Sequence, residues 1–136
     1  MNSRPYLRYT AIAIGYTAGI FILSAIPGQD GEQVVPIPDL LWNLLHIPLF
    51  SGLTWCLLMS LSDWHWSRTV PPSLYGIIWL LAAVYAVLDE WHQSFVVGRS
   101  ANVGDFLLDC TGAAELLLIH RLVSSHGETS PTISSS

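Results

Sequence analysis

Four apolar stretches alternate with short polar segments along the chain. A helix needs about 20 mainly apolar residues to cross a bilayer. The pattern therefore predicts transmembrane helices at about residues 9–26, 40–61, 72–92 and 103–122. The expected fold class is an all-α integral membrane bundle of four transmembrane helices, formed by residues 1–123. Residues 124–136 are rich in Ser and Thr, and we expect them to form a disordered polar tail.

The first apolar stretch has a second interpretation, because Arg4 and Arg8 precede it as they would in a secretory signal peptide. Its length and the three stretches that follow favour a retained helix. Ala11, Gly15 and Gly19 recur every fourth residue of this helix, which predicts a face that packs closely against another helix of the chain.

Composition strengthens the membrane interpretation. The 136 residues are 51% hydrophobic and 11% charged, with no lysine, whereas a soluble domain has about 25% charged residues. Membrane lipids are therefore the expected surroundings. A net charge of -5 argues against nucleic acid as a partner, since such proteins present a basic face. The sequence leaves the oligomeric state open.

The arginines predict the orientation of the bundle. With four spans, Arg99 lies on one side of the membrane, and the other arginines lie on the opposite side: Arg4, Arg8, Arg68 and Arg121. By the positive-inside rule, both termini are expected in the cytoplasm. The segments that follow the first and third helices then face outward. This places His46 near the outer end of the second helix, beside the polar stretch 89–105.

The polar stretch 89–105 directly follows an apolar run, and charge at a membrane is a functional-site hypothesis. Asp89 and Glu90 lie at the end of the third helix, where the helix dipole and partial burial both disfavour an ionised carboxylate. One interpretation is a general acid or base, with His46 as partner. The other is a hydrated helix end that pairs with Arg99, His46 or His92.

Arg99 is the one arginine expected on the outer face, where two helices also begin. Together these features predict a phosphate or carboxylate site; pairing of Arg99 with Asp89, Glu90 or a lipid phosphate is the alternative. The candidate substrate-binding residues on this face are Arg99, Gln93, Ser100, Asp105, Asp109 and Asn43.

Asn102 and Asp105 have the spacing of a helix capping box, which would explain Asp105 structurally. Asp109 follows on the same helix face and is not explained this way. A His with several carboxylates can hold a divalent metal, but the spacing matches no known metal motif. We therefore expect neither a metal nor a cofactor. Glu115, deeper in the fourth helix, has no evident partner.

The polar stretch resembles the VanZ-like family of small bacterial membrane proteins. The resemblance rests on Asp89-Glu90, Gln93, Phe95, Gly98-Arg99-Ser100, Asp105 and Gly112, with weaker matches at Ser24, Pro27-Gly28, His46 and Phe50. The chain departs from the family pattern at Trp42-Asn43, where many members carry Asp-Lys. It also departs at Val97, where Pro is usual, and at Asp109, where Asn is common.

This resemblance implies a protein of the bacterial cytoplasmic membrane with an outward polar site and a role in the cell envelope. The family is named for a protein that confers low-level resistance to teicoplanin, a glycopeptide with a lipid tail. The expected function is binding or modification of an anionic lipid-linked envelope molecule. The alternatives are an intramembrane acid/base enzyme acting on a lipid-linked phosphate and a proton-coupled carrier, so enzymatic activity is left open.

Overall fold

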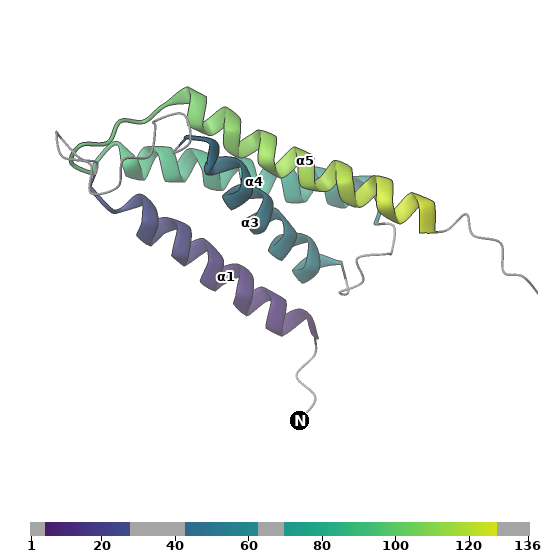
Figure 1. Cartoon of the computed structure of the whole chain (residues 1–136). Helices are drawn as coiled ribbons and strands as arrows, with labels where there is room; N and C mark the ends of the chain where they lie inside the picture. Colours follow the sequence, from purple (N-terminus) through teal and green to yellow (C-terminus); the bar gives the residue numbers. More distant parts are fainter. Residues whose placement is uncertain (1–4, 28–42, 63–69, 128–136) are drawn as a thin grey trace, which may run out of the picture.

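The computed structural model describes residues 5–27, 43–62 and 70–127, and these residues form helices without any strand. The four helices are α1 (Pro5–Ser24), α3 (His46–Leu61), α4 (Pro72–Gln93) and α5 (Val103–Gly127) (Figure 1). The predicted all-α class is therefore confirmed for the described part of the chain.

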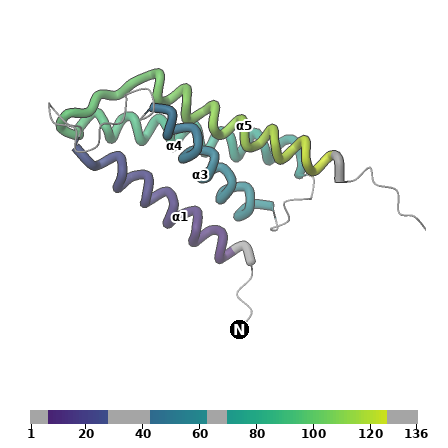
Figure 2. Tube along the Cα trace, in the orientation of Figure 1, coloured from purple at the N-terminus to yellow at the C-terminus, as the bar shows by residue number. Residues whose placement is uncertain are grey.

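Helix α3 lies in the middle of the arrangement and packs against both α1 and α5, while α4 packs mainly against α5. The tube view follows the chain up and down through the four helices (Figure 2). At one end of the bundle α1 and α4 end while α3 and α5 begin. We call this the site end. The first residues of α1 and the last residues of α5 lie at the opposite end (Figure 1).

The helix boundaries agree best with the prediction for α4, which begins at Pro72 and ends one residue later than expected. Helix α3 begins at His46, which places Pro48 in its first turn, where proline is tolerated because the first backbone N–H groups have no helical partner. Residues 40–42 of the predicted second span lie outside the described residues. Helix α1 begins at Pro5, before the predicted start.

The predicted polar tail begins too early, because α5 continues to Gly127. Ser124 is fully buried, and its hydroxyl donates to the carbonyl of Arg121. Such a bond lets a serine remain within a helix by satisfying its side chain locally. Residues 128–136 of the predicted tail lie outside the described residues.

Close packing occurs at Gly112 of α5. A Cβ atom at this position would collide with the backbone carbonyl of Ile47 in α3. On the same helix pair, the Ser51 hydroxyl donates to the Gly112 carbonyl at 2.9 Å. The lack of a side chain at Gly112 therefore lets α3 and α5 approach closely, as small residues do in membrane bundles.

The small-residue face predicted in α1 does not pack in this way. Apart from the adjacent residues and backbone of α1 itself, no described atom lies within 4 Å of where a Cβ would stand on Gly15 or Gly19. Helix α1 instead buries Ala13, Ile20 and Ser24. The prediction of close packing at the glycines was wrong, because the contact with α3 uses a different face of the helix.

The distribution of apolar side chains is typical of a membrane protein. Two described helices, Leu7–Ser24 and Pro72–Gln93, are long and apolar enough to cross a membrane, and only 17% and 22% of their residues are buried. A core helix of a soluble protein would be mostly buried. Large side chains such as Ile14 and Leu80 are exposed, while Asp89 and Asp109 are buried. The exposed apolar side chains and the buried carboxylates together suggest a bilayer as the surroundings.

A buried polar cluster as the candidate functional site

His46 and Asp109 form the central contact of the site end. The imidazole Nδ1 of His46 lies 2.9 Å from Oδ1 of Asp109, within hydrogen-bond distance. The Asp109 carboxylate is fully buried, and His46 is 15% exposed. The two residues are 63 positions apart, and the close approach of α3 and α5 at Gly112 brings their helices together.

Glu90 connects α4 to the beginning of α5. Its Oε2 accepts a hydrogen bond from the backbone N–H of Asn102 at 2.6 Å. In a capping box this N–H would bond to the side chain three residues later, which is Asp105. Asn102 does cap α5, since its Oδ1 accepts the N–H of Gly104 at 2.9 Å. Glu90 thus takes the place predicted for Asp105, and the capping-box explanation of Asp105 is wrong.

Asp105 and Asp109 are both buried on one face of α5, one turn apart, as their spacing predicted. Oδ1 of Asp105 and Oδ2 of Asp109 are buried and lack a hydrogen-bond partner among the described residues. Since buried polar atoms are almost always paired, such unpaired oxygens call for an explanation. They make this face of α5 available to a ligand, a proton or an ion.

Asp89 is buried at the site end and also lines an apolar pocket. Gln93 donates from Nε2 to Oδ2 of Asp89 at 2.8 Å, while Oδ1 of Asp89 is buried without a partner among the described residues. Asp89 also lines a half-open pocket of about 540 Å³. The remaining lining residues are mainly apolar: Phe21, Tyr85, Leu88, Trp91, His92 and Phe95. The site end therefore offers a carboxylate and an apolar cavity side by side.

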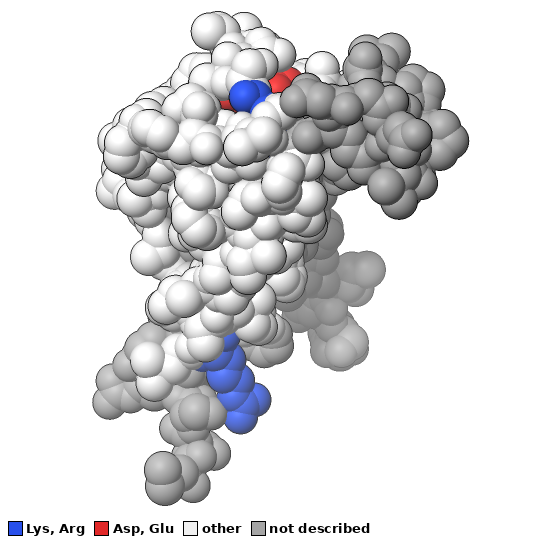
Figure 3. All heavy atoms as spheres, turned by 90° about the vertical axis from the view of Figure 1, so that its left-hand side faces the viewer, with Lys and Arg blue, Asp and Glu red and all other residues white. Residues whose placement is uncertain are grey.

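Arg99 is half-buried in the connection between α4 and α5. Its Nε donates to the backbone carbonyl of Ile26, just after α1, at 3.1 Å. No ion pair between Arg99 and an acid occurs among the described residues, so neither Asp89 nor Glu90 is its partner. Figure 3 looks onto the site end, where basic and acidic atoms are visible in one small area.

Two candidate residues have no recorded hydrogen bond to the cluster within the described residues. Asn43 is half-buried one turn before His46, and Ser100 is exposed.

His92, one of the predicted partners of the acids, stacks on Phe21 with ring centroids 4.1 Å apart. Glu115, for which the sequence indicated no partner, is exposed on α5.

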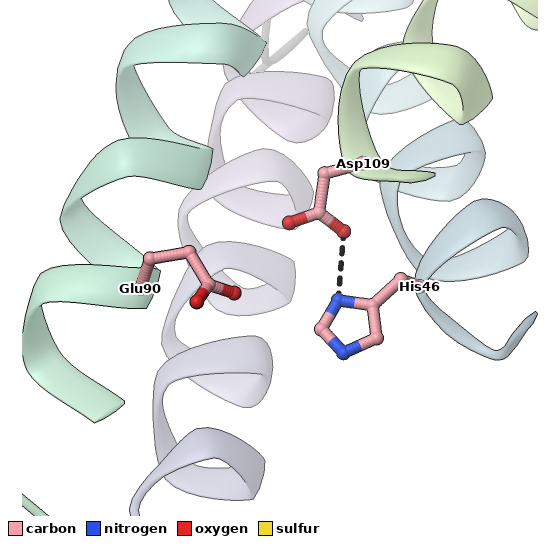
Figure 4. A group of neighbouring side chains, drawn as sticks. All are labelled: His46, Glu90 and Asp109. Carbon is pink, nitrogen blue, oxygen red and sulfur yellow. Dashed lines mark hydrogen bonds and ion pairs between the residues drawn. The ribbon is translucent and has the colours of Figure 1, made fainter. Parts of the chain in front are cut away.

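Three groups that can bind metals converge in the cluster. His46 from α3, Glu90 from α4 and Asp109 from α5 each offer a ligand atom, and these atoms lie within 4.8 Å of one another (Figure 4). The sequence indicated no metal because no two of these residues have the spacing of a metal motif. The convergence depends on three helices meeting, which spacing along the chain does not reveal.

The VanZ/LLP1 family matches residues 7–124. The chain belongs to the VanZ/LLP1 family. No curated protein and no solved structure matches it significantly.

Several residues that carry the VanZ-like resemblance now have a structural explanation. Gly98 adopts φ 73°, a left-handed conformation that glycine accepts without strain, directly before Arg99. Gly112 allows the close approach of α3, and Phe95 lines the apolar pocket. The resemblance therefore includes residues that shape the site end as well as residues that are polar there.

Sequence reasoning missed a second buried polar pair in this VanZ/LLP1 chain. The Tyr75 hydroxyl lies 2.9 Å from Nδ1 of His120, which is fully buried near the opposite end of the bundle. The available signal was a histidine within the apolar run of α5. A single membrane histidine is not specific, and its partner is 45 residues away on another helix.

Proposed function

We propose that this VanZ/LLP1 protein spans the bacterial cytoplasmic membrane with four helices and has both termini in the cytoplasm. At the outer face it binds or modifies an anionic lipid-linked molecule of the cell envelope. The family match, the two long apolar helices and the exposed apolar side chains support a membrane protein. The positive-inside rule supports the orientation, because Arg99 is the only arginine expected on the outer side.

The position of Asp89 is the observation that carries the proposal. This residue is a buried carboxylate of the site end, next to Glu90 in the chain, and it also lines the apolar pocket. A pocket of about 540 Å³ falls within the range of small-molecule sites, about 300–1,000 Å³. An amphipathic ligand matches this arrangement, because its acyl chain can occupy the pocket while its polar head lies against the cluster.

Arg99 supports an anionic head group. Its Nε is held by the carbonyl of Ile26, which positions the guanidinium at the site end while no described carboxylate neutralises it. An arginine fixed in this way can donate its remaining N–H groups to a phosphate or carboxylate. The beginning of α5, three residues after Ser100, adds a helix dipole that favours an anion nearby.

The hydrogen bond between His46 and Asp109 favours an acid/base enzyme as the second candidate function. A carboxylate that bonds to one imidazole nitrogen orients the ring and sets which nitrogen carries the proton. In this function His46 would exchange a proton with the substrate, Asp89 or Glu90 would act as a second acid or base, and Arg99 would hold a phosphate. Turnover distinguishes this candidate from a protein that only binds.

Native mass spectrometry of the purified protein with its bound lipids tests both candidates. We expect an anionic lipid or lipid-linked sugar to remain bound to the wild type and to be lost from Arg99→Ala. Arg121→Ala is the matched control, because it removes an arginine from α5 near the opposite end of the bundle. Retention of the lipid by Arg99→Ala would contradict the proposed head-group contact.

Glu90→Gln and His46→Ala separate binding from catalysis in the same experiment. A binding protein should keep its lipid when Glu90 becomes Gln, since the amide preserves size and can still accept a hydrogen bond from Asn102. An enzyme should also keep its lipid but stop forming a converted product seen with the wild type. A link to teicoplanin resistance would then be tested by comparing the sensitivity of cells that express wild type or Arg99→Ala.

A further inference from the structure

The carboxylates of Glu90 and Asp109 are each held by one oxygen while the other is free for a ligand. Oε2 of Glu90 accepts from Asn102, and Oδ1 of Asp109 bonds to His46. The second oxygens, Oε1 and Oδ2, are buried and without a partner among the described residues. Glu90 is 8% exposed and Asp109 is not exposed at all. Both carboxylates are therefore oriented in advance, and each has an unused acceptor in the interior.

The two carboxylates lie close to the imidazole of His46. In Figure 4 the side chains of Glu90 and His46 project from α4 and α3 toward Asp109 of α5. One ligand atom from each residue lies within 4.8 Å of the other two. Atoms bound to one tetrahedral Zn²⁺ at about 2.1 Å are about 3.4 Å apart. An inward movement of each side chain by less than about 1 Å would bring the three residues into range.

The charge of the surroundings also favours a cation. Four carboxylates are buried at the site end: Asp89, Glu90, Asp105 and Asp109. The nearest described arginine, Arg99, donates its Nε to a backbone carbonyl and makes no ion pair with them. Carboxylates removed from water need a counter-charge or must bind protons. A divalent cation supplies two positive charges at one point within the cluster.

We propose that His46, Glu90 and Asp109 bind one divalent transition-metal cation. One nitrogen and two carboxylate oxygens suit Zn²⁺ or Mn²⁺ better than Mg²⁺ or Ca²⁺, which prefer oxygen alone. Three protein ligands leave a coordination position open, as in catalytic rather than structural zinc sites. This position would accept water or a phosphate oxygen. The cation site does not require the proposed lipid ligand, so each can be tested without the other.

The test uses purified full-length protein without an affinity tag, stripped with a chelator in detergent. Titration calorimetry with Zn²⁺ and elemental analysis after dialysis should show about one ion per chain. Co²⁺ provides an independent spectroscopic readout on the wild type. Its visible absorption bands should have the positions of a mixed nitrogen and oxygen ligand set and should disappear when Zn²⁺ is added.

Matched variants locate the site. Asp109→Asn, Glu90→Gln and His46→Ala should each weaken Zn²⁺ binding at least ~10-fold. Glu115→Gln removes an exposed carboxylate of α5, and His92→Ala removes an imidazole of the site end that lies outside the three ligands. Both controls should bind Zn²⁺ as the wild type does.

Absence of stoichiometric Zn²⁺ and Mn²⁺ binding by the wild type would overturn the proposal and would leave protonation as the compensation for the buried acids. Binding that survives all three ligand variants would place the ion elsewhere and would overturn it equally. Should a variant fail to fold, the Co²⁺ spectrum of the wild type still tests the proposal. Band positions typical of oxygen ligands alone would contradict a role for His46. Loss of the cation without loss of the lipid would leave the proposed function intact.

Discussion

The two ends of the bundle treat buried polar groups differently. Toward the opposite end, several polar side chains bond to one another or to their own helix. Tyr75 pairs with His120 at 2.9 Å, Thr10 with Ser60 at 2.7 Å, and Ser62 donates to the carbonyl of Leu58. At the site end, four buried carboxylates each keep one oxygen without a partner among the described residues. The first arrangement connects helices, whereas the second leaves binding capacity unused.

This contrast separates polar residues that stabilise the fold from polar residues that are available for a ligand. A satisfied interhelical hydrogen bond contributes modestly to stability, and a cluster of buried acids opposes it unless a counter-charge is present. We therefore expect removal of a hydrogen bond at the opposite end to lower stability and leave binding unchanged. Removal of a buried charge at the site end should weaken binding without lowering stability. Gly112→Ala tests the packing that forms the site end, and Tyr75→Phe and Asp105→Asn then test the contrast between the ends.

The largest effect is expected at Gly112, where α3 and α5 meet. In Gly112→Ala the new Cβ would collide with the backbone of Ile47, so the helices must separate. Overpacking of this kind costs about 1–3 kcal/mol of the free energy of unfolding. The separation should also pull His46 away from Asp109 and weaken ligand binding. Denaturant titration in mixed micelles measures the stability, and native mass spectrometry measures the bound lipid.

Gly76→Ala is the matched control for this prediction, because its added Cβ in α4 would meet no described atom within 4 Å apart from the adjacent residues and backbone of its own helix. It should leave both stability and lipid binding nearly unchanged. Equal stability of Gly112→Ala and wild type would show that the close approach of α3 and α5 is not required.

An intermediate effect is expected near the opposite end for Tyr75→Phe. This change removes the hydroxyl that lies 2.9 Å from Nδ1 of His120 and keeps the ring. Loss of one buried hydrogen bond should lower the free energy of unfolding by about 1 kcal/mol. Lipid and Zn²⁺ binding should be unchanged, because the pair lies outside the site end. A loss of binding without a loss of stability would remove the distinction between the two ends.

The smallest effect on stability is expected for Asp105→Asn, which should not lower the free energy of unfolding, in contrast to the two preceding substitutions. Asp105 is buried among other acids, and its carboxylate does not serve the capping box. Removing its charge should leave the stability unchanged or raise it by up to about 1 kcal/mol, as often happens when a functional site is neutralised. Binding of Zn²⁺ should weaken, because the cluster attracts a cation less strongly.

The same titrations on Asp105→Asn and Tyr75→Phe compare the two ends directly. If Asp105→Asn destabilised the protein more than Tyr75→Phe, the acids would have to be regarded as part of the structural framework.

Much of the helical organisation follows from the order of residues alone. The apolar run before Asp89 and the prolines at positions 71 and 72 define α4 within one residue, because hydrophobic length and proline chemistry are local properties. The same local reasoning placed the polar stretch 89–105 at one end. Alternating helix direction then predicted that His46 would lie beside it.

The pairing within the site needed the tertiary structure. The hydrogen bond of Glu90 to Asn102 in place of Asp105, and that of Arg99 to Ile26, both cross between elements. Local spacing favoured Asp105 as the capping partner, and charge favoured an acid for Arg99. Neither rule accounts for what another helix brings into reach.

The sequence by itself therefore determined that this chain is helical, apolar on the outside of its long helices and polar at one end, since these features depend on periodicity and length. Only the tertiary structure decided which oxygens are held and which are free. That outcome depends on how closely α3 and α5 approach at Gly112 and on Glu90, the side chain that α4 directs toward the beginning of α5. Both are properties of packing between residues far apart in the chain, so spacing along the sequence does not contain them.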